Sequence, residues 1–130
     1  MKKIVSTTEA PAAIGPYSQA VIHHDIVYTS GQIPLKADGT LVDGDVGEQA
    51  RQVLTNLAYV LNEAGSRIQN VIKTTVYLEN MDDFDKVNAV YGAFFKEPYP
   101  ARCTVAVRTL PKNVKIEIEA IAHVDDLNQI

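Results

Sequence analysis

The chain has 130 residues and a formal net charge of −4 at pH 7. This is the length of one domain, so we expect a single domain over residues 1–130 and exclude a multidomain assembly. The acidic balance, without any cluster of Lys or Arg, excludes the basic surface that duplex-DNA binders present.

Composition also bears on the compartment. No segment approaches the roughly 20 apolar residues that a membrane-spanning helix requires. The single cysteine, Cys103, cannot form a disulfide within the chain, which is typical of a reducing compartment. We therefore expect a soluble, cytoplasmic protein without a membrane partner.

The periodicity of apolar residues predicts the elements. In chain order they are a short edge strand at residues 2–5, strands at 19–24 and 25–30, a helix at 46–64, a strand at 71–79, a helix at 83–96, and strands at 101–109 and 114–124. Asp45 can cap the first helix, with Glu48 at the capping-box position and Gly65 at its end. Pro98 ends the second helix.

The resulting order, β-β-β-α-β-α-β-β, predicts an α+β fold in which both helices cover one face of a single mixed sheet. The opposite face is then left to solvent or to another subunit.

Alternation along the last two strands places the polar side chains. Arg102 and Thr104 share one face of their strand, and Cys103 points to the other. Glu117 and Glu119 likewise share one face of the next strand. If the apolar positions of both strands meet the helices, Arg102 and the glutamates lie together on the open face, and Cys103 is buried.

From the residues alone, each candidate has two interpretations. Arg102 could grip a carboxylate, or it could pair with a glutamate on the surface. Glu117 and Glu119 could act as general bases or form a solvated strand face. Asn88, on the apolar stripe of the second helix, could hold a neighbouring loop or contact a ligand.

Two loops, at residues 14–18 and 30–34, are rich in small residues and could approach a ligand or serve only as turns. Neither has the spacing of a phosphate-binding loop. The three histidines lack metal-ligand spacing, so we expect no metal site and no Ser-His-Asp triad.

Four motifs carry a resemblance that covers nearly the whole chain. They are AAIGPYSQA at 12–20, TSGQIP at 29–34, PAR at 100–102, and LPK at 110–112 together with IEIEAIA at 116–122. In these motifs the chain resembles the Rid family of reactive intermediate (enamine/imine) deaminases, formerly called YjgF, and within it the RidA subgroup.

The resemblance implies a chorismate-mutase-like fold and a homotrimer with active sites between adjacent subunits. The implied activity is hydrolysis of 2-imino acids, formed from 2-aminoacrylate and 2-aminocrotonate, to 2-oxo acids and ammonia. It requires no metal or organic cofactor.

The resemblance also implies roles for individual residues. Arg102 binds the substrate carboxylate, and Glu117, rather than Glu119, positions the attacking water. Residues implied to contact the substrate are Tyr17 as an aromatic lid, Ser30 and Gly31 in a loop, Asn88 beside the site, and Thr104, where many RidA members carry a cysteine.

Two other functions stay open. One is a non-catalytic family member that binds small 2-oxo acids or regulates a partner. The other is a ribonuclease or translation inhibitor, a label attached to the family. Because of the net charge of −4, we do not expect a nucleic-acid partner.

Overall fold

The structure is a computed structural model, and it describes residues 1–125. The elements are β1 (Lys3–Val5), β2 (Ala20–His23), β3 (Ile26–Thr29), α1 (Val46–Glu63), β4 (Val71–Leu78), α2 (Phe84–Phe94), β5 (Ala101–Ala106) and β6 (Ile116–His123), with short 3-10 turns at Ile68–Asn70, Met81–Asp83 and Pro111–Asn113. The predicted order of strands and helices is confirmed. The rest of the expected domain, residues 126–130, lies outside the described residues.

All the strands form one sheet in the order β1-β2-β3-β6-β4-β5. Only β4 and β5 pair in parallel, joined through α2, whereas the other neighbours are antiparallel. The tight connection between β2 and β3 passes through His24 and Asp25, both with positive φ, which matches the right-handed twist of a two-residue hairpin.

Helix α1 begins as predicted. Asp45 accepts a hydrogen bond of 2.9 Å from the Glu48 backbone N–H, which satisfies one of the unpaired donors of the first turn. Gly65, with φ of 79°, allows the chain to leave the helix. Helix α2 is shorter than its predicted range, since a 3-10 turn precedes Phe84.

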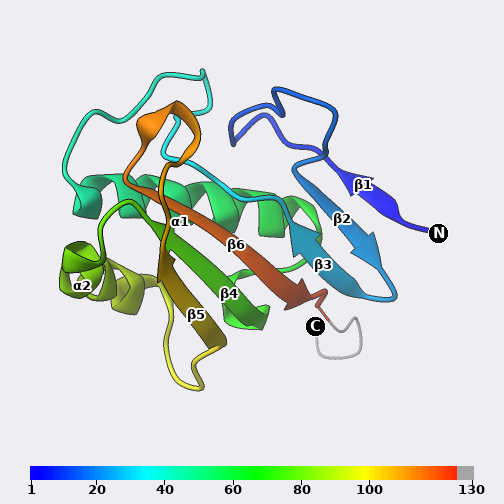
Figure 1. Cartoon of the computed structure of the whole chain (residues 1–130). Helices are drawn as coiled ribbons and strands as arrows, with labels where there is room; N and C mark the ends of the chain where they lie inside the picture. Colours follow the sequence, from blue (N-terminus) through cyan, green and yellow to red (C-terminus); the bar gives the residue numbers. More distant parts are fainter. Residues whose placement is uncertain (126–130) are drawn as a thin grey trace.

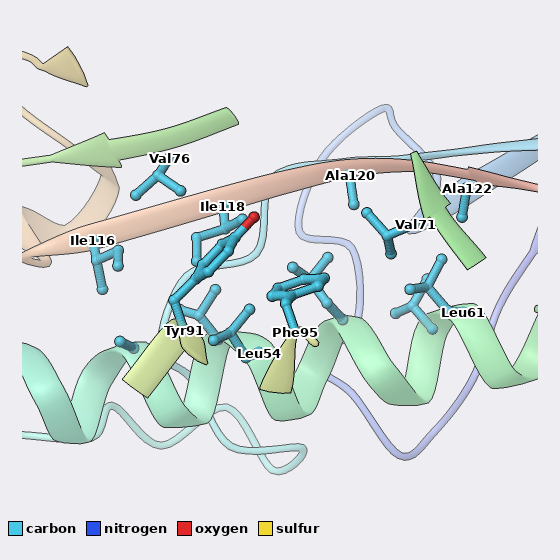
Figure 2. Packing of buried hydrophobic residues seen from close by; sticks show 14 of the residues in the cluster. Leu54, Leu61, Val71, Val76, Tyr91, Phe95, Ile116, Ile118, Ala120 and Ala122 are labelled. Atoms are coloured by element: carbon cyan, nitrogen blue, oxygen red, sulfur yellow. The ribbon is translucent and has the colours of Figure 1, made fainter. Parts of the chain in front are cut away.

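Both helices pack on the same face of the sheet, and α1 packs against β6 and β3 (Figure 1). Figure 2 shows the apolar layer between α1 and the sheet, with Leu54 of α1 facing Ile118 of β6 and Leu61 facing Ala122. These side chains are at most 3 % exposed. Their burial is the main favourable contribution to folding.

Within residues 1–125 no helix covers the other face of the sheet. The large apolar side chains exposed on it include Ile4 of β1, Tyr28 of β3, Ile72 of β4 and Val105 of β5, at 59 %, 43 %, 47 % and 36 %. We refer to this side of the sheet as the uncovered face. Neither helix is both long and apolar enough to cross a bilayer within residues 1–125.

Candidate active site

Arg102 is exposed on the edge strand β5, and residues of α2 hold its side chain. Its Nη1 donates to Asn88 Oδ1 at 2.8 Å, and its guanidinium carbon lies 4.7 Å from the centre of the Tyr91 ring and 5.4 Å from that of Phe84. Tyr91 is fixed in turn, because its hydroxyl and Thr74 Oγ1 are hydrogen-bonded at 2.7 Å. The amide and the rings orient the guanidinium, which can still bind a carboxylate through its other N–H groups.

The helical repeat explains this cluster. Phe84, Asn88 and Tyr91 stand at positions i, i+4 and i+7 of α2 and therefore share one face of the helix. Asn88 accepts a hydrogen bond from Arg102, so its side chain supports the guanidinium and not a neighbouring loop. Phe84 and Tyr91 were not among the site residues predicted from the sequence.

Thr104 stands one pleat beyond Arg102 on the same side of β5. Its Oγ1 is buried and has no hydrogen-bond partner among the described residues. Buried hydroxyls are usually paired, so this one is available to a group that enters from outside. Together, Arg102, Asn88 and Thr104 make up the arginine cluster.

The prediction that Arg102 shares a surface with Glu117 is wrong. Arg102 is paired with Thr74 of β4 across the β4–β5 ladder, whereas Glu117 is paired with Tyr77 across the β4–β6 ladder. Thr74 and Tyr77 are three residues apart, so they point to opposite faces of the sheet. Arg102 therefore lies on the helix side, and Glu117 lies on the uncovered face.

The prediction that Cys103 is buried is wrong for the same reason. Cys103 is level with Thr75 and Glu119, and it is exposed on the uncovered face. The apolar residues of β5 were expected to face the helices. This edge strand turns them to the uncovered face instead, and only Thr104 in it is even partly buried.

Glu117 on β6 belongs to a second group of site residues. Its carboxylate lies so close to Gly31 that a Cβ at that position would be 2.9 Å from Glu117 Cδ. Burial, followed by the nearby charge of Glu119, raises the pKa of Glu117. A carboxyl group with a raised pKa is a better proton acceptor than an ordinary glutamate.

The loop after β3 is attached to β6 and reaches this carboxylate. Gln32 and Ile118 exchange backbone hydrogen bonds of 2.8 and 3.2 Å, which fix Gly31 beside Glu117. The Ser30 hydroxyl donates to the Ser18 carbonyl at 2.6 Å. The structure thus brings Ser30, Gly31 and Glu117 together, which we call the glutamate group.

Tyr17 stands next to Ser18 in the preceding loop and is 49 % exposed. Its hydroxyl accepts from the Ile14 backbone N–H at 3.3 Å, and its ring borders a hollow of 470 Å³ formed by the N-terminal segment. No hydrogen bond within the described residues joins Tyr17 to Arg102 or Glu117. It lies on an exposed loop, and the lid role that the resemblance implies stays a prediction.

Glu119 has a partner that sequence reasoning did not identify. The Tyr77 hydroxyl donates to Glu119 Oε1 at 2.5 Å. This hydrogen bond, helped by burial, raises the pKa of Tyr77 to about 12, so the hydroxyl keeps its proton. In residues 1–125 we find no group of three His, Cys, Asp or Glu side chains that could hold a metal ion.

Comparison with known proteins assigns this chain to a family. A family model described as endoribonuclease L-PSP matches residues 7–124. A cattle (Bos taurus) protein named 2-iminobutanoate/2-iminopropanoate deaminase is 50 % identical over 123 residues, which is 94 % of this chain and 90 % of that protein.

Solved structures agree with the sequence matches. YyfA from Yersinia pestis, described as a member of the conserved Rid protein family, superposes with a TM-score of 0.93 at 46 % identity, covering 95 % of this chain and 100 % of that one. TdcF from Escherichia coli, solved with bound serine, gives a TM-score of 0.89 at 44 % identity and covers 95 % and 99 % of the two chains.

Proposed function

This chain belongs to the Rid (YjgF) family, and we propose that it is a deaminase that hydrolyses 2-imino acids to 2-oxo acids and ammonia. The substrates are 2-iminopropanoate, the tautomer of 2-aminoacrylate, and 2-iminobutanoate. The name of the cattle relative, at 50 % identity over most of both chains, supports this assignment.

The observation that carries the proposal is the way in which neighbouring side chains orient the guanidinium of Arg102. An exposed guanidinium on an aromatic and amide support suits the carboxylate that every 2-imino acid bears. The serine bound to the Escherichia coli relative TdcF carries an α-carboxylate of the same kind.

In the proposed reaction, Arg102 holds the carboxylate while Glu117 takes a proton from water. The water oxygen bonds to the imine carbon, and the electron pair of the C=N bond passes to nitrogen. Glu117 returns this proton to nitrogen, which gives a carbinolamine. The proton of its new hydroxyl group then passes through Glu117 to the nitrogen, and the C–N bond breaks and releases ammonia as the C=O bond forms. Atoms and electrons balance with water alone, so the proposal requires no cofactor.

The other site residues complete the pocket in this proposal. The Gly31 carbonyl accepts from the imine N–H, Ser30 lines the same loop, and Tyr17 closes over the substrate. Asn88 orients Arg102, and the unpaired Thr104 hydroxyl contacts the substrate.

A single chain does not complete this site, because Arg102 and Glu117 lie on opposite faces of the sheet. We infer a homotrimer in which the arginine cluster of one subunit meets the glutamate group of the next. The exposed apolar side chains of the uncovered face support such an assembly. We further infer a cytoplasmic enzyme, consistent with a single free cysteine.

The description of the family model favours a second candidate, an endoribonuclease. The net charge of −4 argues against it, since phosphate binding relies on Lys and Arg. A non-catalytic 2-oxo-acid binder is the third candidate.

One assay separates the three. A serine dehydratase generates 2-aminoacrylate in a cuvette, and 2-oxo acid formation is followed with and without this protein. We expect faster formation with wild type and only the background rate with Arg102→Ala. Binding of a 2-oxo acid without acceleration would support the binder, and cleavage of RNA without acceleration would support the ribonuclease.

A further inference from the structure

The two glutamates of β6 differ in what surrounds them. Glu119 Oε1 accepts a short hydrogen bond from Tyr77, whereas Glu117, beside Gly31, has no hydrogen-bond donor among the described residues. Both are partly buried on the uncovered face. They are therefore neighbours of the same charge in different environments.

Tyr77 connects the two glutamates through the geometry of the sheet. It is directly opposite Glu117 in the β4–β6 pair, yet its hydroxyl reaches diagonally to Glu119. Diagonal neighbours in an antiparallel pair are within reach of an aromatic side chain. The tyrosine therefore holds the carboxylate of Glu119 on the same face of the sheet as that of Glu117.

Neither carboxylate forms an ion pair in residues 1–125, where the one ion pair joins Arg67 and Asp125. Lys73 lines the same hollow as Glu119 without pairing with it. Lys115 directs its ammonium group to the Gly44 carbonyl at 2.9 Å. The other titratable groups on this side of the neighbouring strands are Tyr28 of β3, Lys73 and Tyr77 of β4, and Cys103 of β5.

The hydrogen bond and the lack of an ion pair to either glutamate within residues 1–125 both favour an effect of Glu119 on Glu117. The hydrogen bond from Tyr77 holds the Glu119 carboxylate in place. The charge of Glu119 then adds to burial in raising the pKa of Glu117. Tyr77 keeps its own proton, since its pKa is raised to about 12.

We propose that Tyr77 and Glu119 form a positioning pair whose fixed negative charge makes Glu117 a stronger proton acceptor in catalysis. The proposal rests on the proposed function in assigning the water chemistry to Glu117. Neither Tyr77 nor Glu119 needs to touch the substrate, because both act through Glu117.

The test measures Glu117 itself as well as the reaction. The side-chain carboxyl groups of glutamate are labelled with ¹³C, and the Glu117 signal is assigned by its loss in Glu117→Gln. Its titration is followed in wild type, Glu119→Gln and Tyr77→Phe. In parallel, the pH profile of kcat/KM for imine hydrolysis is recorded for each protein.

We expect Glu119→Gln to move the Glu117 titration, and the acidic limb of the kcat/KM profile, to lower pH. Above that limb, a weaker base should reduce kcat/KM on the order of 3- to 10-fold. Tyr77→Phe should shift both in the same direction, because the Glu119 side chain without its hydrogen-bond donor is free to turn away from Glu117. In the Glu119→Gln background, Tyr77→Phe should add no further shift, since its only route to Glu117 is gone.

Thr75→Ala is the matched control, because Thr75 is level with Glu119 on the same face but carries no charge. It should leave the titration of Glu117 unchanged. An unchanged or upward shift in Glu119→Gln, with the thermal midpoint retained, would overturn the proposal. If Glu119→Gln does not fold, the result for Tyr77→Phe decides in the same way.

The two readouts separate this inference from the proposed function. A wild type that hydrolyses no imine would refute the proposed function, and with it any role of the pair in catalysis. The NMR titration would still decide whether Tyr77 and Glu119 control the proton affinity of Glu117.

Discussion

A hydrogen bond and an aromatic ring orient the Arg102 side chain for binding a planar anion. Asn88 takes one N–H of the guanidinium, and Tyr91 lies 4.7 Å from its central carbon, so the plane of the group is set before any ligand arrives. A lysine would retain the positive charge but lose both the fork and the stacking geometry.

Arg102→Lys should therefore reduce kcat/KM for imine hydrolysis about as much as Arg102→Ala, by on the order of 10²-fold or more. Circular dichroism should show an unchanged fold, because the side chain is exposed. Near-normal turnover in the lysine variant would mean that charge alone is sufficient.

Glu117 gives a prediction about stability. A carboxyl group whose pKa is raised in the folded state stabilises the fold at pH below the unfolded pKa, and this contribution is lost as the pH rises through the folded pKa. At neutral pH its ionised form is thus a cost to the fold. Glu117→Gln should have a higher thermal midpoint than wild type at pH 7, and the gain should disappear near pH 4.

The same variant should lose catalysis, by on the order of 10²-fold or more, the usual effect of removing a general base. Glu119→Gln, measured beside it, should lose less. Scanning calorimetry and the imine assay on both variants check the pair of effects. A lower midpoint at pH 7 for Glu117→Gln would contradict the cause assigned to the pKa shift.

At the scale of elements, the loop after β3 depends on the absence of a side chain at Gly31. A Cβ there would lie 2.9 Å from Glu117 Cδ, and the flexible glutamate would have to move. Displacement of about 1 Å in a catalytic group can cost on the order of 10²-fold in rate.

Gly31→Ala should therefore reduce turnover by about that factor while the fold remains intact. Gly92→Ala is the matched control, because a Cβ on this residue of α2 would meet nothing within 4 Å. It should leave turnover unchanged and stabilise the helix by up to ~1 kcal/mol. Equal turnover in both variants would refute the close packing of Gly31 against Glu117.

Periodicity predicted each helix and strand, because long amphipathic segments carry their own pattern. It did not predict the orientation of β5, where apolar Cys103 and Val105 were taken to face the helices. Alternation fixes which residues share a face of a strand. Which of the two faces packs against the helices depends on the neighbouring strands. An edge strand has the same alternating sequence pattern whether its apolar side chains pack on another subunit or on the core.

The site was predictable only where motifs carried it. Strand alternation marked Arg102 and Glu117 as candidates, and the resemblance supplied the roles proposed for them. Nothing in the sequence pattern singled out Tyr77 and Phe84. Their roles arise from a diagonal contact across β4 and β6 and from stacking across α2 and β5. Such contacts join residues distant in sequence, and no local pattern encodes them.

At the scale of the whole molecule, the separation of Arg102 and Glu117 by the sheet has a consequence for assembly. If each site takes its arginine from one subunit and its glutamate from the next, neither residue needs to be intact in every subunit. Arg102→Ala and Glu117→Gln proteins should each be inactive as pure trimers, yet mixtures should recover activity.

The expected recovery follows from counting interfaces in a closed ring. Any trimer that contains both variants has one interface where an intact Arg102 meets an intact Glu117. With random mixing at equal amounts, about three quarters of trimers are mixed, so activity should reach about a quarter of wild type. Unfolding and refolding the two proteins together, with sedimentation to verify trimers, provides the measurement. Activity no higher than that of the separate variants, despite mixed trimers, would place both residues in one subunit's site and refute the intersubunit arrangement.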